Sequence, residues 1–141
     1  MKYILVLFVC IASSQLAISQ SVFGKWEILK ESGEVRSIIE IYENDGIVNG
    51  KVVEILDKEK EDNLCIECEG EEKNKKILGL VLLKDFKKDQ EKYVDGTILN
   101  PDDGKIYKSK IWVDEHNPNI LNVRGYIGFF YKTMEWRRLI E

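Results

Sequence analysis

The sequence predicts an all-β fold, a small antiparallel up-and-down β-barrel of about eight strands. Several segments alternate apolar and polar residues with a period of two, as strands with one buried face do. Turn residues separate these segments at short intervals, and helical periodicity is almost absent. Closing such a sheet into a barrel removes its exposed edges, and the short sequential connections favour this arrangement over a β-sandwich.

The first three expected strands cover about residues 22–29, 35–42 and 47–56. In the second of these, Val35, Ser37, Ile39 and Ile41 share one face. The turns between them contain Gly33 and the run Asn44-Asp45-Gly46, which tolerates a positive φ.

A charged and polar stretch over residues 57–76 then interrupts the strand pattern. Loops of this length in a compact domain are often functional or locally stapled. Residues 77–86 are almost continuously apolar, and their length favours a strand.

Four further strands are expected over about residues 93–99, 105–113, 120–127 and 129–140. The run Asn100-Pro101-Asp102-Asp103-Gly104 predicts a turn, with Gly104 at a positive φ. The last strand places Met134 and Trp136 opposite Glu135 and Arg137.

Residues 1–20 have the order of a secretory signal peptide: Lys2, a short apolar run, and small residues before Gln20. The apolar run is shorter than the roughly 20 residues that span a bilayer. We therefore expect an exported protein, periplasmic or secreted, with one domain over residues 21–141 and no transmembrane span in the mature chain. Cys10 follows Phe8 and Val9, which is a poor fit to a lipoprotein cleavage site.

The formal net charge of −4 argues against a nucleic-acid partner, which would need a clustered basic surface. After the leader, two cysteines remain, Cys65 and Cys68, in a C-x-x-C spacing. In an oxidising compartment such thiols usually form a disulfide. A redox pair or a metal site are the alternatives, but the acids around the pair oppose thiol reactivity and a zinc site needs about four ligands.

Gly24-Lys25-Trp26 at the start of the first strand and Arg137-Arg138 in the last strand resemble the signature of the calycins and lipocalins. The resemblance implies that Trp26 plugs one end of the barrel and that a late arginine, Arg138, packs across it. A guanidinium stacks well on an indole face and donates to nearby carbonyls.

A second resemblance covers nearly the whole expected domain. It rests on a series of short motifs: Gly24-x-Trp26, Asn49-Gly50-Lys51-Val52-Val53, Cys65-x-x-Cys68, Leu78-Gly79-Leu80, Gly96-Thr97-Ile98-Leu99-Asn100-Pro101, Gly104-Lys105-Ile106-Tyr107, Leu121-x-Val123-Arg124-Gly125-Tyr126-Ile127-Gly128 and Trp136-x-Arg138. In this order they resemble an exported bacterial family of unknown function, domain of unknown function 2147. The resemblance implies a secreted lipocalin-like β-barrel and no established activity.

Aromatic side chains are the candidates for a ligand site inside the barrel: Trp26, Tyr107, Tyr126 and Trp136. Asp95 would need a partner if it pointed inward, and Arg124 or Lys51 could serve. The alternative is that these rings simply fill the core, because a barrel of eight strands lies at the size where either outcome is found.

Other chemistry has less support. His116 lies in a turn of surface residues, and no motif supplies a nucleophile beside it. Asp102 and Asp103 lack the spacing of a calcium loop. We expect no catalytic residues, no metal and no cofactor.

The favoured hypothesis is a small exported barrel that binds a small apolar or amphipathic ligand in the cell envelope. A protein-interaction or structural envelope module is the alternative, using residues 57–76 or an outer sheet face that carries Trp112. Its partner would be an envelope protein. An enzyme has the least support, because no converging titratable groups stand out.

Overall fold

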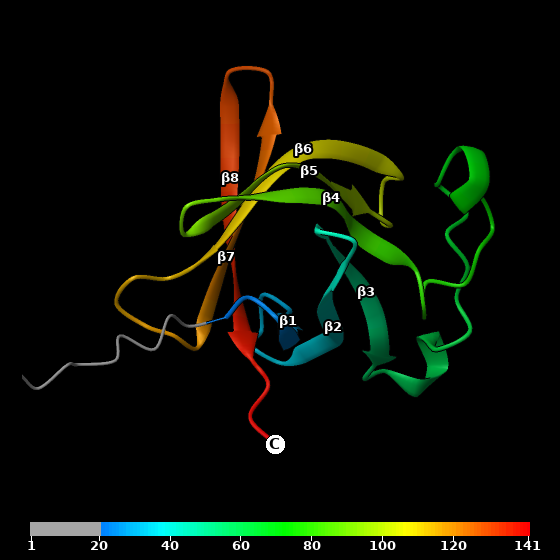
Figure 1. The fold of residues 1–141 in the computed structure, drawn as a ribbon. Coiled ribbons are helices and arrows are strands. Elements are labelled where there is room, and N and C mark those ends of the chain that lie inside the picture. Colours follow the sequence, from blue (N-terminus) through cyan, green and yellow to red (C-terminus); the bar gives the residue numbers. More distant parts are fainter. Residues whose placement is uncertain (1–20) are drawn as a thin grey trace, which may run out of the picture.

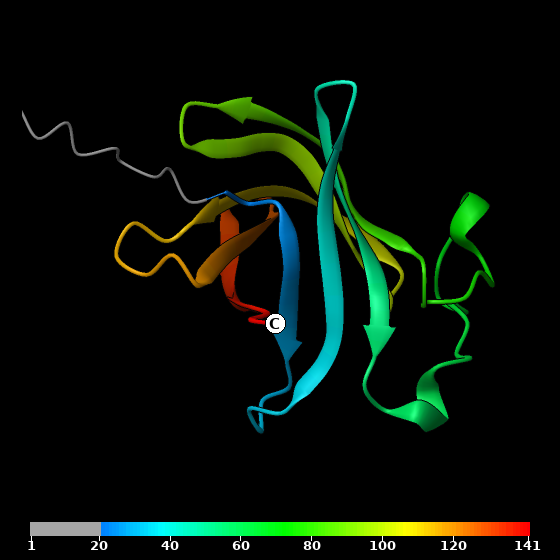
Figure 2. The same cartoon turned by 60° about the horizontal axis from the view of Figure 1, so that its bottom comes forward.

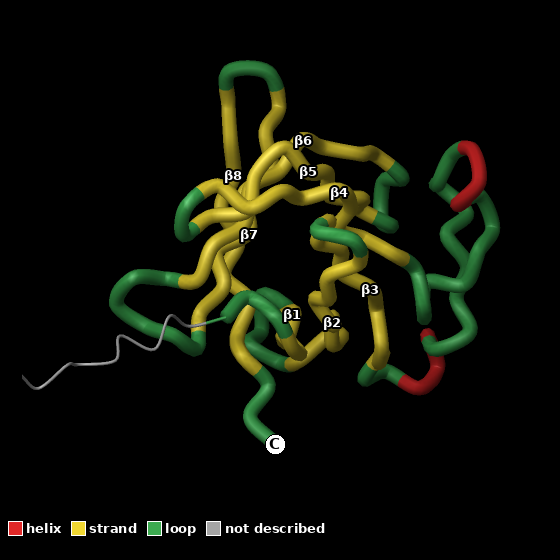
Figure 3. The backbone as a smooth tube through the Cα atoms, viewed as in Figure 1, coloured by secondary structure: helices red, strands yellow, loops and turns green. Residues whose placement is uncertain are grey.

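The computed structural model describes residues 21–141, so the expected signal peptide lies outside the described residues. Eight strands follow one another along the chain: β1 (Gly24–Leu29), β2 (Val35–Asn44), β3 (Ile47–Ile55), β4 (Val81–Asp89), β5 (Lys92–Asn100), β6 (Lys105–Val113), β7 (Ile120–Ile127) and β8 (Phe130–Arg138). Two short 3-10 helices, η1 (Lys58–Lys60) and η2 (Gly70–Glu72), lie between β3 and β4. Figure 3 shows that strands make up most of the described chain and that these two turns are its helical parts.

Each strand pairs antiparallel with the next, and β8 pairs with β1, so the sheet closes into a barrel (Figure 1). The predicted up-and-down barrel is thereby confirmed. The closing seam is short, since only Trp26 with Arg138 and Glu27 with Arg137 are paired across it. Beyond that seam, β7 and β8 continue together as a hairpin that projects past the other strands (Figure 1).

The inward faces of the strands form the core. Its most enclosed side chains include Trp26, Ile39, Leu83, Phe86 and Ile111. These positions come from strands all around the barrel, so the alternation seen in the sequence does bury one face of each strand.

Strand boundaries differ from the expected ones mainly at β4. Ile77 and Leu78 belong to the preceding connection, because Gly79 turns the chain with a φ of +92° and Leu80 donates to the Ile77 carbonyl. The strand then continues through Lys87, Lys88 and Asp89, which pair with the start of β5. Pairing with a neighbour, rather than apolar pattern, sets the end of this strand.

The connection over residues 56–80 stands along one side of the barrel (Figure 2). A disulfide joins Cys65 and Cys68, both fully buried, and an isolated bridge pairs Leu64 with Lys76. An ion pair between Glu72 and Lys84 ties the segment to β4, and this hydrogen bond lowers the pKa of Glu72. The predicted long loop is thus present, and its disulfide and pairings give it a defined course.

Candidate functional site: a cavity in the open end of the barrel

The barrel interior is filled at one end and hollow at the other. The hollow part is a cavity of about 860 Å³, open at the end where β1 leads into β2 and β5 leads into β6. All eight strands contribute to its lining. Ligand pockets in proteins commonly measure about 300–1,000 Å³, so this volume suits one small molecule.

The wall of the cavity is mostly apolar. Its apolar members include Ile28, Val52, Ile55, Leu82, Ile98, Leu99, Tyr107, Met134 and Trp136. Ser37 on β2 adds a hydroxyl to this wall. Such a lining favours the hydrocarbon part of a guest and leaves little inside to recognise a charge.

Charged side chains surround the mouth instead. Arg36 on β2 donates two hydrogen bonds to Asp102 in the β5–β6 turn, with N–O distances of 3.0 and 2.6 Å. Because β2 and β5 are not neighbours in the sheet, this ion pair links two sides of the mouth. The hydrogen bond from Arg36 to Asp102 also raises the pKa of Arg36.

Lys132 on β8 is different from the other cations of the mouth. Lys30 pairs with Glu34, and Lys60 pairs with Asp57, whereas Lys132 makes no ion pair within residues 21–141. It lies opposite Gly125 of β7 on the inward face of the hairpin. A cation is therefore available at the edge of the apolar wall.

Tyr107 joins the wall to the mouth. Its ring lines the cavity, and its hydroxyl donates to Asp103 Oδ2 at 2.8 Å. The Asp103 carboxylate also accepts the Lys105 N–H, and these two bonds lower the pKa of Asp103, while the pKa of Tyr107 is raised. The bond holds the phenol at the rim and leaves the ring face to the interior.

The opposite end of the barrel is closed by Trp26. Its side chain has no exposed surface, and its Nε1 donates to the Val22 carbonyl at 2.8 Å. The Arg138 guanidinium lies 4.2 Å from the centre of the Trp26 ring. Arg138 also donates to the carbonyls of Pro118 and Ser21, so it ties three segments together over the indole. Burial lowers the pKa of Arg138.

The six candidate ligand residues therefore lie in different parts of the barrel. Tyr107 and Trp136 line the cavity. Trp26 lies at the closed end, and Arg124 and Tyr126 lie on the outer face of β7. Period-two alternation explains the last two, because Val123 and Gly125 take the inward positions of that strand.

Asp95 is exposed and does not point into the barrel. It sits at a φ of +59° where the β5–β6 register shifts between Tyr93 and Gly96. This β-bulge inserts an extra residue and turns the Asp95 side chain outward. The direction of the Asp95 side chain could not be predicted from the sequence, because an alternating pattern does not reveal the position of a bulge.

Trp112 lies on the outer face of β6 but is half-buried. Lys92, Lys110 and Arg124 each lie about 5 Å from its ring centre, at 4.9, 5.4 and 5.0 Å. The surface that the alternative hypothesis assigned to a partner is thus largely covered by cations of the same sheet.

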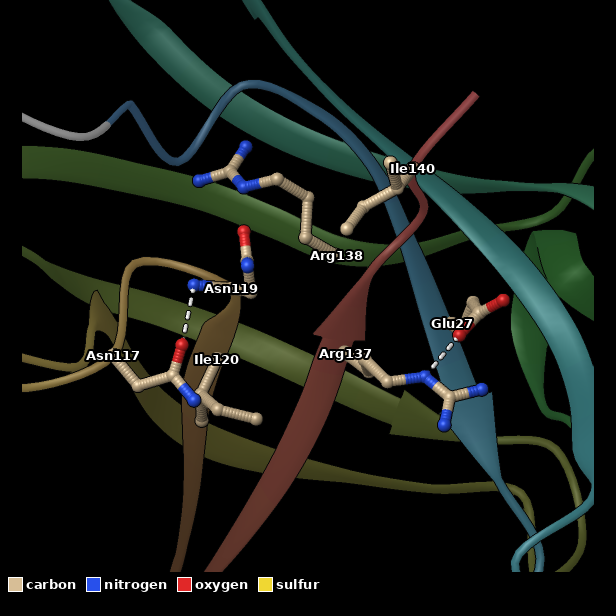
Figure 4. A pocket seen from close by; sticks show the side chains of 7 residues that line it. All are labelled: Glu27, Asn117, Asn119, Ile120, Arg137, Arg138 and Ile140. Atoms are coloured by element: carbon tan, nitrogen blue, oxygen red, sulfur yellow. Dashed lines mark hydrogen bonds and ion pairs between the residues drawn. The ribbon is translucent and has the colours of Figure 1, made fainter.

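A second, shallower hollow of about 330 Å³ lies at the seam between β1 and β8 (Figure 4). Arg137 donates to Glu27 across the seam at 2.5 Å, and Asn117 accepts the Asn119 N–H below it (Figure 4). The ion pair of Arg137 with Glu27 holds the last strand against the first, and the Asn117–Asn119 bond shapes the β6–β7 connection. We attribute a structural role to this hollow.

Within residues 21–141, no group of three or more histidine, cysteine or acidic side chains is placed to hold a metal ion. His116 is exposed in the β6–β7 connection, where its N–H donates to Asp114 Oδ1. Among the described residues, no helix has the length and apolar character needed to cross a membrane.

A closed eight-stranded barrel with a plugged end and an apolar cavity at the other end defines a lipocalin-like protein. The chain matches over residues 24–138 the family described as "Uncharacterized protein conserved in bacteria (DUF2147)", and it belongs to that family. The expected family membership is confirmed.

One solved structure similar to this chain is that of a Helicobacter pylori protein, described as "Protein HP1028 from the human pathogen Helicobacter pylori belongs to the lipocalin family". The two chains are 21% identical, the match covers 86% of this chain and 84% of that chain, and the TM-score is 0.72. At this identity the likeness concerns the fold. No curated protein matches the chain.

Sequence reasoning missed the mouth of the cavity. Arg36, Asp102 and Lys132 come from three separate parts of the chain, and only barrel closure brings them to one end. Lys132 alone could have been predicted to face inward, because the period-two alternation of β8 places it on the same face as Met134 and Trp136.

Proposed function

We propose that this protein binds a small apolar or amphipathic molecule in the open cavity of the barrel. The observation that carries the proposal is the combination of an apolar wall with a charged mouth in one cavity of about 860 Å³. Burying a hydrocarbon chain there removes apolar surface of both the ligand and the protein from water. This burial favours binding by roughly 25 cal/mol per Å².

The position of Lys132 refines the proposed ligand. An acidic head group at the mouth would find an ammonium that forms no ion pair within residues 21–141. Charge-assisted hydrogen bonds are stronger than neutral ones. A single-chain amphiphile with an anionic head fits both parts of the site.

The proposed setting is the cell envelope, after export. The apolar run and small-residue exit within residues 1–20 support this part of the proposal. The disulfide is consistent with it, since disulfides persist mainly in oxidising compartments.

Native mass spectrometry of protein purified from its own host under mild conditions tests both parts. We expect a protein mass that lacks about the first 20 residues, with a bound molecule that organic extraction releases. A protein that carries no guest, and takes none from a total lipid extract, contradicts the binding proposal. A retained leader contradicts the export proposal alone.

A further inference from the structure

The tip of the β7–β8 hairpin exposes an unusual run of apolar side chains. Ile127 is 63% exposed, Phe129 104%, Phe130 79% and Tyr131 59%. Gly128 makes the tight turn between them with a φ of +58°. Single exposed apolar residues are ordinary, whereas a contiguous exposed cluster marks an interaction site.

The shape of this cluster limits what it contacts. The hairpin projects beyond the neighbouring strands, so its tip is convex and reaches into the solvent (Figure 1). Ile127 and Phe130 lie opposite each other on the inward face, beyond the mouth of the barrel. A projecting apolar tip suits insertion into a soft apolar medium.

The sheet behind the tip is basic. Residues 105–113 and 120–134 contain five cations, Lys105, Lys108, Lys110, Arg124 and Lys132, and no acidic residue, in a chain with a net charge of −4. Of the acids next to these ranges, Asp103 accepts from Tyr107 and Lys105, and Asp102 beside it pairs with Arg36. Asp114 and Glu115 lie in the β6–β7 connection, where Asp114 accepts from His116, Asn117 and Asn122. Glu135 begins the part of β8 that leads to the closed end.

Aromatic residues stand between the apolar tip and the cations. Tyr126 and Tyr131 face each other across the hairpin with ring centres 6.1 Å apart. Arg124 lies 4.1 Å from the centre of the Tyr131 ring and donates to Thr133 at 2.9 Å. Apolar tip, tyrosines and then cations is the order in which a bilayer presents hydrocarbon, interface and charged head groups.

We propose that the β7–β8 hairpin inserts its tip, Ile127 to Phe130, into the interfacial region of a bilayer that contains anionic lipids. The outer face of β6 and β7, with Lys108, Lys110 and Arg124, then rests on the head groups, and Lys132 lies at the mouth beside them. This surface function goes beyond ligand binding and does not depend on it. Because Ile127 and Lys132 also line the cavity mouth, docking would hold the mouth at the membrane surface.

Co-sedimentation with vesicles tests the proposal, using residues 21–141, which contain every strand of the barrel and omit the apolar leader. Vesicles of phosphatidylcholine with phosphatidylglycerol are compared with vesicles of phosphatidylcholine alone. We expect binding to the anionic vesicles that weakens as salt rises.

Three variants separate the contributions. In the double variant Phe129→Ser/Phe130→Ser, we expect binding to fall by about tenfold or more, because the apolar anchor is lost. Lys108→Gln, which lies outside the cavity, should weaken binding by about fivefold, the value of one cation near an anionic surface. Ile140→Ser is the control. It changes an isoleucine that is about as exposed as the tip residues but lies near the closed end, so it should leave binding unchanged.

A tryptophan at the tip gives a second measurement in an otherwise native protein. The fluorescence of Phe129→Trp should shift to the blue with anionic vesicles and not with neutral ones. Equal vesicle binding by the wild type and the double serine variant would overturn the proposal, as would no binding at all. A concentration-dependent dimer in solution that the serine variant abolishes would assign the tip to a second copy of the chain instead.

Discussion

Among the glycines of the strands, Gly96 is the one where an added side chain would have the least room. A Cβ atom built there would lie 2.4 Å from Cγ and Cδ2 of Phe86, whose ring has no exposed surface. Phe86 on β4 thus packs directly on the backbone of β5, and its ring covers the site where a side chain would stand.

We expect Gly96→Ala to destabilise the barrel by about 1–3 kcal/mol, as overpacked core substitutions do. Gly125→Ala is the matched control, since the added Cβ would meet only ordinary contacts at 3.8 Å. Urea denaturation followed by tryptophan fluorescence measures both. A Gly96→Ala variant as stable as the control would show that Phe86 can move aside.

Trp26 and Arg138 show what a sequence motif can predict about a contact and what it cannot. The resemblance implied an indole plug under a late arginine, and the two side chains lie in that arrangement. The sequence does not predict that the Pro118 and Ser21 carbonyls accept from Arg138, because every residue has a backbone carbonyl.

Among the elements, the β6–β7 connection depends on one carboxylate. Asp114 accepts the N–H groups of His116 and Asn117 on Oδ1 and the Asn122 side chain on Oδ2. These hydrogen bonds, led by that from His116, lower the pKa of Asp114 below its ordinary 3.8. The stabilisation is therefore fully present above pH 3.8 and is lost as the pH falls through the lower pKa of the folded state.

We expect Asp114→Asn to flatten the pH dependence of stability below about pH 4, because the amide cannot gain a proton there. Thermal melts at a series of acid pH values compare the variant with the wild type. His116→Ala is the control, since it leaves the Asp114 carboxylate in place. Parallel pH profiles for Asp114→Asn and the wild type would contradict the assignment.

The strands were predictable to the extent that one face of each is buried. β6 and β7 match the expected ranges, because their inward residues alternate without interruption. β4 does not, since its last residues are charged and are held by pairing with β5. The course of residues 56–80 was beyond prediction, because tertiary contacts such as the ion pair of Glu72 with Lys84 determine it.

On the scale of the whole molecule, the two ends of the barrel differ in structure. Trp26 and Arg138 close one end, and the other end has an apolar cavity with a charged mouth. The proposed membrane-binding tip lies beside that same mouth. Composition alone could not decide between a filled and a hollow barrel, because the difference depends on how side chains from eight strands meet.

The central claim is that the cavity binds the hydrocarbon part of an amphiphile, and a fluorescence titration tests it most directly. The probe is cis-parinaric acid, whose emission rises in an apolar site. Gly125→Leu would fill the cavity from β7, while Tyr126→Leu changes the next residue, on the outer face.

We expect saturable binding of one probe per wild-type barrel, unchanged in Tyr126→Leu and weakened by about tenfold or more in Gly125→Leu, because the new side chain takes the space of the guest. Affinity that is equal in all three proteins, or a wild type that binds no probe, would contradict the claim.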